Sequence, residues 1–369
     1  MNKLICWICC KGKDMKFDVI VGNPPYQESD GGHAASATPI YTEFVNLAKS
    51  ISPYYISIIM KSNWMSGDSL KKFRNIFLND SHIKLLSDYP VSNDIFKNNT
   101  DIKGGVCYFL WDKSFNNNEC LFINNLENNY NSKKRKLCIE GTDALLRFNN
   151  SISIFEKVNS FNEEKMDKYV TARKPFGLDT SVKGDNLYNN DSLILYGNKT
   201  ESYISRERIT DEFQLVDKYK IFISYAYGAG NNFPHQILNK PIPVKPKCVC
   251  SETYICIGPF NELNIDNVKK YIESKFFRFM VLLLKNTQHA TQYVYKLVPV
   301  QDFTQHSSKD ILENNSLIDW SKSITKLDKE ANEKYECSTI NEIDAMLYKK
   351  YGLDKEEVQF IEKMIKPMK

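Results

Sequence analysis

The residues whose types and spacing could do chemistry form the run Asn23-Pro24-Pro25-Tyr26. They follow an apolar segment, residues 17–21, whose composition predicts a buried β-strand. Because neither proline can donate to a sheet ladder, this strand has to end in a rigid, extended tetrapeptide. Open α/β sheets bind their ligands in the crevice beyond the carboxyl ends of the strands. The sequence therefore places Asn23 and Tyr26 where chemistry usually takes place.

This run resembles the catalytic motif of the N6-adenine-specific DNA methyltransferases, and with Gln27 it is similar to the methylase part of Eco57I-type restriction-modification enzymes. Two later segments also resemble this family, namely residues 61–65 (Lys-Ser-Asn-Trp-Met) and residues 101–111, which contain Gly104-Gly105. The alternative interpretation is an ordinary strand-to-loop turn with a capping asparagine. The preceding strand and the two later matches favour the catalytic interpretation.

The resemblance implies site-specific N6-methylation of adenine in DNA, with S-adenosyl-L-methionine as the methyl donor and no metal. Adenine's amino group is a poor nucleophile, because its lone pair is delocalised into the ring. The Asn23 carboxamide oxygen and the Pro24 carbonyl would accept hydrogen bonds from its two N–H groups and free that lone pair. Tyr26 would stack on an adenine flipped out of the duplex, and Pro25 and Tyr108 would contact the same base. For Tyr108, a place in the sheet core is an equal alternative.

The resemblance also implies an α/β fold, with a partial Rossmann-like methyltransferase sheet followed by an α+β target-recognition domain. Apolar patterns predict further strands at 54–60 and 83–89 and helices at 40–48, 69–78, 268–284 and 355–364. Helix 69–78 is basic, and we expect Lys71, Lys72 and Arg74 to face solvent, with phosphate contact as the alternative. The expected domains are a methyltransferase catalytic region at 15–148, a DNA target-recognition domain at 150–305 and a C-terminal helical tail at 306–369.

Two polar segments of the expected recognition domain are candidates for contact with double-stranded DNA. Residues 225–235 combine glycine turns with aromatic and polar side chains that can reach base edges. Residues 285–292 follow the apolar helix 268–284, and here Lys285, Gln288 and His289 are the candidate DNA-binding residues. The alternative for this second segment is a capped helix end. Residues 116–135 are asparagine-rich and basic at their end, which predicts either a surface hairpin or a loop beside DNA.

The glycine-rich loop that holds the cofactor's methionine part in this family should precede the catalytic strand. Only sixteen residues precede residue 17, and they contain no G-x-G element. We therefore expect either a second polypeptide that supplies the cofactor-binding half or a truncated gene product. A nuclease would also require another segment or subunit. The same reasoning predicts an open sheet edge at residues 17–21.

Composition sets broad limits on this chain. Its 369 residues suffice for two domains, and the net charge of +4 is compatible with nucleic acid without indicating it. The ten cysteines are scattered, C-x-x-C at 6–9 and C-x-C at 248–250 lack partner pairs at zinc spacing, and no apolar run is long enough for a membrane span. We expect a cytoplasmic protein. Two other functions stay open: a DNA-recognition fragment without catalysis of its own, and a methyltransferase for protein or RNA.

Overall fold

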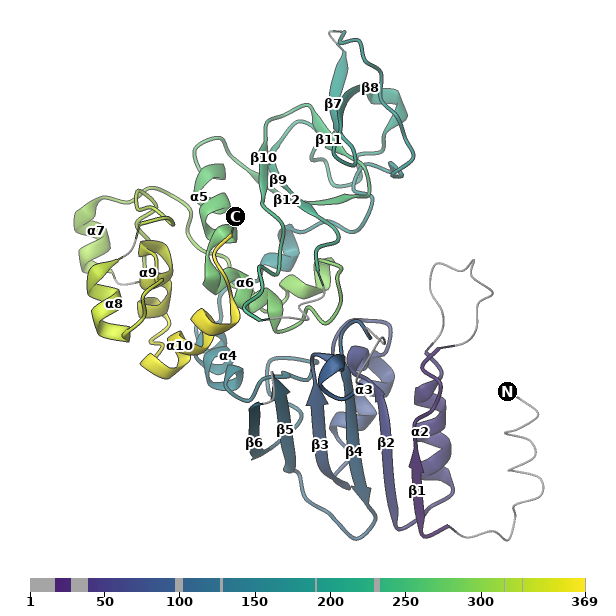
Figure 1. The fold of residues 1–369 in the computed structure, drawn as a ribbon. Coiled ribbons are helices and arrows are strands. Elements are labelled where there is room, and N and C mark those ends of the chain that lie inside the picture. The colour runs from purple at the N-terminus through teal and green to yellow at the C-terminus, as the bar shows by residue number, and fades with distance from the viewer. Residues whose placement is uncertain are drawn as a thin grey trace. The chain divides into compact units, whose positions relative to one another are not determined.

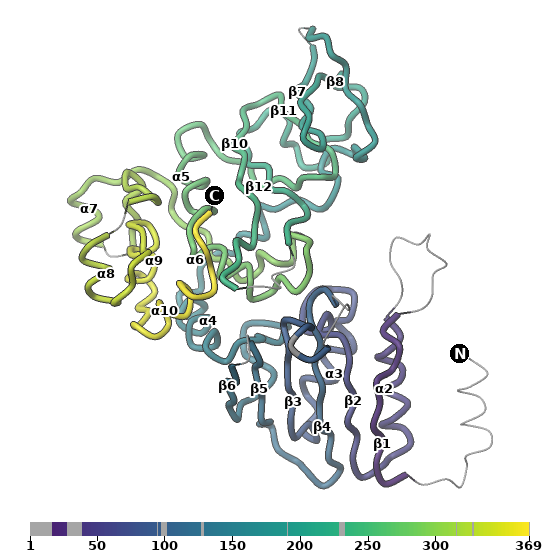
Figure 2. The backbone as a smooth tube through the Cα atoms, in the orientation of Figure 1, coloured from purple at the N-terminus to yellow at the C-terminus, as the bar shows by residue number. Residues whose placement is uncertain are grey.

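The computed structural model describes residues 17–27, 39–96, 102–126, 129–189, 191–228, 233–314, 316–326 and 328–368. It divides into two compact units. Figures 1 and 2 show the helices and strands of each unit. Unit 1 extends to Trp64 and continues through Leu70–Ile139, and unit 2 consists of Met65–Ser69 and Glu140–Lys369. Both units contain helices and strands, so the chain has a mixed α/β structure.

Unit 1 is built on a six-stranded sheet with the order β1-β2-β4-β3-β5-β6 (Figure 1). Its strands are β1 (Val19–Gly22), β2 (Tyr55–Lys61), β3 (Ile83–Tyr89), β4 (Val106–Asp112), β5 (Cys120–Leu126) and β6 (Asn129–Arg135). Strands β1, β2, β3 and β5 run in one direction, whereas β4 and β6 run in the other. The asparagine-rich segment is therefore a hairpin, which was one of its two predicted forms.

Helices α2 (Tyr41–Ser50) and α3 (Lys71–Leu78) cover one face of this sheet. Phe73 packs edge-on against Tyr41 of α2 and against Trp64, and Phe77 packs against Phe109 of β4 at a ring distance of 5.0 Å. The prediction that Arg74 faces solvent is wrong. Its side chain is fully buried, and its guanidinium donates to the Trp64 carbonyl at 3.2 Å, so the buried charge has a hydrogen-bond acceptor.

Strand β1 is present but is not buried as the sequence predicts. Val19 and Val21 are 52% and 76% exposed. They pair with Tyr55 and Ser57, so they lie on the face opposite the buried residues Ile56 and Ile58. Within the described residues, β1 pairs only with β2. The open sheet edge that the sequence predicts is therefore present in the described part of unit 1.

Unit 2 contains two three-stranded sheets with the orders β10-β9-β12 and β11-β7-β8 (Figure 1). Their strands are β7 (Ser192–Tyr196), β8 (Glu201–Ser205), β9 (Tyr219–Ser224), β10 (Ile242–Val244), β11 (Cys248–Cys250) and β12 (Tyr254–Phe260). Leu193, Leu195, Phe222 and Val249 belong to one buried cluster, so the two sheets share a core. Cys248 and Cys250 are buried in it as apolar side chains.

Helices form the rest of unit 2. They are α4 (Ser151–Ser160), α5 (Ile265–Glu273), α6 (Lys275–Leu282), α7 (Ser308–Glu313), α8 (Lys329–Tyr335), α9 (Glu342–Lys350) and α10 (Lys355–Met364). The expected single helix at 268–284 is wrong, because Ser274 separates α5 from α6. This serine has an extended backbone (ψ 151°), and its hydroxyl accepts from the Phe277 N–H at 3.1 Å as the N-cap of α6. Short 3₁₀ turns complete the chain at Ser62–Met65, Ser92–Asp94, Met166–Tyr169, Arg206–Arg208 and Gln292–Tyr295.

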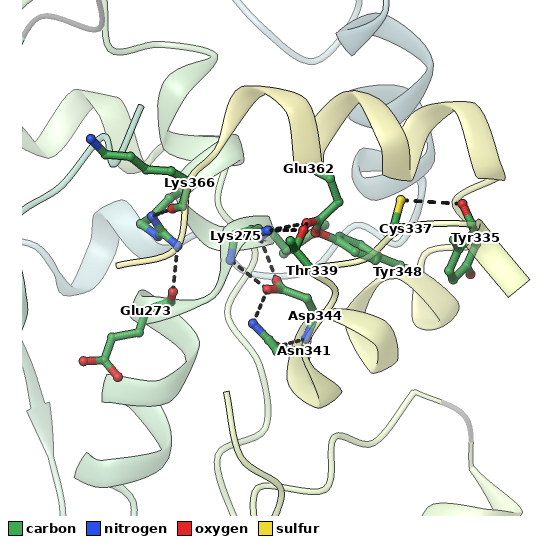
Figure 3. Close-up of polar contacts among 12 residues, drawn as sticks. Glu273, Lys275, Tyr335, Cys337, Thr339, Asn341, Asp344, Tyr348, Glu362 and Lys366 are labelled. Atoms are coloured by element: carbon green, nitrogen blue, oxygen red, sulfur yellow. Dashed lines mark hydrogen bonds and ion pairs between the residues drawn. The ribbon is translucent and has the colours of Figure 1, made fainter. Parts of the chain in front are cut away.

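A buried polar network joins the start of α6 to α9 and α10 (Figure 3). The fully buried Asp344 carboxylate accepts from the Lys275 N–H at 3.0 Å and from the Phe276 N–H at 2.9 Å. The Lys275 ammonium pairs with Glu362 of α10 and donates to Thr339 at 3.1 Å. Burial, together with the nearby Glu362 charge, raises the pKa of Asp344 to about 6. The network therefore fixes the last two helices to the centre of unit 2.

Candidate functional site

The Asn-Pro-Pro-Tyr motif lies at the carboxyl edge of the sheet in unit 1. Gly22 ends β1 immediately before the motif, and Lys61 ends β2. Val106 at the start of the antiparallel strand β4 pairs with Lys61 on one side and with Tyr89 at the end of β3 on the other. Four chain segments thus meet at one edge, which is where open α/β sheets place their ligands.

Hydrogen bonds connect the neighbouring segments at this edge. The Ser62 N–H donates to the Gly105 carbonyl at 3.1 Å, and the Ser62 hydroxyl donates to the Asp88 carboxylate at 2.8 Å. Gly105 has a φ of +80°, and a Cβ at this position would lie 2.2 Å from the Tyr89 carbonyl oxygen. Only glycine fits there. Asp88 is fully buried, and sequence reasoning missed it because its partner Ser62 is 26 residues away.

The four motif residues differ in exposure. Pro24 is buried, whereas Asn23 and Pro25 are exposed, so the Asn23 carboxamide is accessible. Tyr26 is half-buried, and its hydroxyl is buried without a hydrogen-bond partner among the residues that the structure describes. Burial raises the pKa of Tyr26, which keeps its phenol neutral. The site can therefore present an amide oxygen beside a fixed, uncharged aromatic ring.

Two contacts hold the chain just after the motif. The Tyr26 carbonyl accepts from the Ile40 N–H at 3.3 Å, and Gln27 forms a bridge with Pro39. The Lys61 ammonium donates to the Gln27 side-chain oxygen at 3.0 Å, and burial lowers the pKa of Lys61. Sequence reasoning named Gln27 and the segment beginning at Lys61 separately, and the structure brings them together. Residues 28–38, which include Gly31-Gly32, lie outside the described residues.

Tyr108 occupies the middle of β4, paired with Ile59 on one side and Ser87 on the other. It is half-buried, and its ring lies 6.2 Å from that of Tyr89. Its neighbours Cys107 and Phe109 point to the face that the helices cover, so Tyr108 points to the opposite face. Contact of Tyr108 or Pro25 with a base stays a prediction.

In unit 2, the two polar segments predicted to contact DNA lie side by side. Ala226 and His289 form an antiparallel bridge, flanked by hydrogen bonds from the Tyr227 N–H to the Gln288 carbonyl (2.9 Å) and from the Ala290 N–H to the Tyr225 carbonyl (2.8 Å). Gln288 and His289 are half-buried, and the Gln288 Nε2 lies 3.3 Å from the His289 Nε2. We name this pair of segments, residues 225–228 and 285–290, the joined loops. Residues 229–232 of the first predicted segment lie outside the described residues.

The buried Lys285 side chain connects the joined loops through hydrogen bonds to their backbone carbonyls. The residue is 5% exposed, and its ammonium donates to the carbonyls of Tyr227 (2.8 Å), Gly228 (2.7 Å) and Thr287 (3.0 Å). Burial lowers the pKa of Lys285 to about 7. Direct contact of Lys285 with DNA stays a prediction, but the geometry supports a positioning role, because three carbonyls take the donors of its ammonium.

Replacing Lys285 with methionine is expected to loosen the joined loops. The thioether fills similar space but leaves three carbonyls without their donor. Amide hydrogen exchange at Tyr227 and Ala290 should become at least about tenfold faster, since about 1.4 kcal/mol of lost local stability has that effect. Lys240→Met, at an exposed lysine of the same unit, is the control and should leave both rates unchanged. Equal exchange rates in the Lys285 variant and the parent would contradict the positioning role.

In the described part of the chain, no three side chains of His, Cys, Asp or Glu are grouped so that they could hold a metal ion. None of the described helices is long and apolar enough to cross a membrane. The cysteines at positions 6, 9 and 10 lie outside the described residues.

Comparison with known proteins relates the motif region to one family. Residues 2–96 match the model of the Eco57I restriction-modification methylases. The chain is 32% identical over 182 residues to a Mycoplasma pneumoniae (strain ATCC 29342 / M129 / Subtype 1) protein described as an uncharacterized adenine-specific methylase. This match covers 44% of the chain and 41% of the relative, so the chain spans less than half of that relative's length.

Solved structures of restriction-modification enzymes are also similar to parts of the chain. The type IIL enzyme MmeI in complex with DNA has a TM-score of 0.44 at 9% identity, covering 93% of this chain and 54% of that one. The DrdV–DNA complex has a TM-score of 0.45 at 9% identity, covering 77% of this chain and 43% of that one. Residues 2–96, which contain the Asn-Pro-Pro-Tyr motif, are therefore similar to the Eco57I-type restriction-modification methylases, and the resemblance that the sequence predicted is confirmed.

Proposed function

We propose that this chain is a site-specific DNA adenine N6-methyltransferase, or the methylase and specificity portion of a type II restriction-modification enzyme. The observation that carries this proposal is the Asn23–Tyr26 motif, which lies inside the family match and at the carboxyl edge of the sheet. The exposed Asn23 and the half-buried Tyr26 support the roles proposed for them. Double-stranded DNA is the proposed partner, with recognition assigned to unit 2.

The chemistry required of these residues is activation of a weak nucleophile. The Asn23 Oδ1 and the Pro24 carbonyl oxygen would accept hydrogen bonds from the two N–H groups of adenine's amino nitrogen, which moves the nitrogen towards tetrahedral geometry and frees its lone pair. The Tyr26 ring stacks on the base and keeps the amino group in place. A neutral phenol suits this stacking role, which agrees with the raised pKa of Tyr26.

S-adenosyl-L-methionine is the methyl donor that the resemblance to this family implies. The described residues of unit 1 account for only one side of such a site. They present the base side of the site in Asn23, Pro24 and Tyr26, but residues 17–27, 39–96 and 102–126 contain no G-x-G turn between a strand and a helix. The described residues therefore do not fit the cofactor's methionine part, and the roles proposed for Asn23, Pro24 and Tyr26 concern the adenine base only.

A second candidate is a DNA-recognition portion that requires another polypeptide to complete the cofactor site. The exposure of Val19 and Val21 on the edge strand β1 favours it, because an apolar edge is a surface on which another chain can add a strand. The same second polypeptide, or another one, would supply any nuclease activity. A methyltransferase acting on protein or RNA would use the same acceptor chemistry on a different nitrogen.

The deciding experiment measures transfer of labelled methyl from S-adenosyl-L-methionine to adenine in mixed-sequence duplex DNA by the purified chain. Transfer to adenine supports the first candidate. Sequence-selective DNA binding without transfer supports the second. Equal or greater transfer to RNA or to a glutamine-containing peptide, measured in parallel, would contradict both.

A further inference from the structure

Three segments of unit 2 meet at the ring of Tyr225, which follows β9 at the start of the joined loops. The His289 ring stacks on it with a centroid distance of 4.8 Å and an interplanar angle of 18°. The guanidinium carbon of Arg173 lies 5.2 Å from the Tyr225 ring centroid. These three residues come from positions more than 50 residues apart, so tertiary structure alone assembles the cluster.

A carboxylate fixes the Arg173 guanidinium from a second direction. Its Nη2 lies 2.8 Å from Oε2 of Glu252. The Glu252 side chain is 13% exposed and accepts from Thr180 through both the backbone N–H (3.3 Å) and the hydroxyl (3.1 Å). Arg173 is thus held between an aromatic ring and an anchored carboxylate, which limits the orientations of its planar fork.

The free side of Arg173 remains accessible. Its side chain is 55% exposed although Glu252 and Tyr225 both contact it. An arginine has five N–H donors, so those beyond the Glu252 contact can serve a ligand with paired acceptors. Tyr225 and His289 are half-buried and border the same surface.

The charge balance of the cluster favours a base edge over a phosphate. Glu252 and Asp179 together offset the charges of Arg173 and its neighbour Lys174, so phosphate binding would gain little from counterion release and would meet nearby anions. A fixed guanidinium fork matches the O6 and N7 acceptors of guanine in the major groove. A side chain that binds the DNA phosphate backbone needs a net positive charge, whereas a side chain that reads a base needs a fixed orientation. The Arg173 cluster supplies a fixed orientation.

We infer that Arg173, held by Tyr225 and Glu252, reads a guanine in the DNA sequence that this chain recognises. The inference rests on the proposed function only in requiring sequence-selective DNA binding, and it does not require methyl transfer by the isolated chain. Tyr225 and Glu252 are positioning residues in this assignment. His289 completes the stack and connects it to the second of the joined loops.

The test is selection of bound sequences from a randomised duplex library by the full chain and its variants. Arg173→Ala is expected to lose, by about tenfold or more, the preference for guanine at one position and to keep the preferences elsewhere. Arg173→Lys keeps the charge without the fork and should show the same loss. Arg206→Ala is the matched control, because Arg206 is another exposed arginine of unit 2 paired with an aspartate, and it should leave the motif unchanged.

Several outcomes would overturn the assignment. One is an unchanged motif in both Arg173 variants. Another is uniformly weaker binding with a shallower salt dependence, which is the signature of a phosphate contact. Failure of the parent chain to enrich any motif would also overturn it. If thermal unfolding shows that Arg173→Ala does not fold, the DNA sequence selected by Arg173→Lys decides whether the assignment holds. If the parent chain enriches a DNA sequence but transfers no methyl group, the result would count against the proposed methyl transfer alone and not against the role of Arg173.

Discussion

Replacing Asn23 with alanine is expected to lower the rate of methyl transfer to adenine by at least about a hundredfold, with duplex binding unchanged. An acceptor aimed at charge that develops in the transition state is worth about 10²–10³ in rate. Asn23 is exposed, so its truncation leaves the packing of unit 1 intact. The measurement is single-turnover transfer of labelled methyl at saturating DNA, which separates chemistry from binding.

Two variants make this result specific. Asn75→Ala removes an exposed asparagine from helix α3 of the same unit and should leave the rate unchanged. Asn23→Asp keeps an acceptor oxygen at the same place and should retain more activity than Asn23→Ala. A rate for Asn23→Ala within threefold of the parent's, about 0.7 kcal/mol of activation free energy, would remove this side chain from its proposed role.

The sequence pattern predicted correctly those strands and helices whose ends are marked by nearby residues, such as a helix cap. The strand at 83–89 and the helix at 355–364 have the bounds that the sequence predicted, and that helix begins with a capping box at Asp354 and Glu357. The two-helix arrangement around Ser274 was missed because the apolar stripe continues across the break. α6 is buried on every side, so periodicity alone could not reveal its boundary.

Charged residues were the least predictable part of the candidate site. A solvated face was predicted for Arg74, and DNA contact or a capped helix end for the segment of Lys285, yet the structure buries both side chains and directs their donors to backbone carbonyls. Such partners come from turns that are distant in sequence, as with Tyr227 and Lys285. The motif at Asn23 could be recognised without such a partner, because the function proposed for it depends on four adjacent residues at the end of a strand.

The buried network of unit 2 leads to the second large effect, at Asp344. Asp344→Ala should lower the free energy of unfolding by about 3 kcal/mol at neutral pH. Two N–H groups at the start of α6, those of Lys275 and Phe276, lose their acceptor, and each unsatisfied buried donor costs about 1–3 kcal/mol. Asp266→Ala, at an exposed aspartate in the first turn of α5, is the control.

The pH dependence of this effect has a definite sign. The pKa of Asp344 is raised from its ordinary value of 3.8 to about 6, so between these values the folded chain holds the proton more tightly than the unfolded chain. This contribution is fully present below about pH 4 and is lost as the pH rises through about 6. Alanine binds no proton at this position. The deficit of Asp344→Ala should therefore grow on acidification from pH ~7 to pH ~4, by up to about 3 kcal/mol. Urea unfolding at several pH values measures it, and a deficit that shrinks on acidification would contradict the assigned direction.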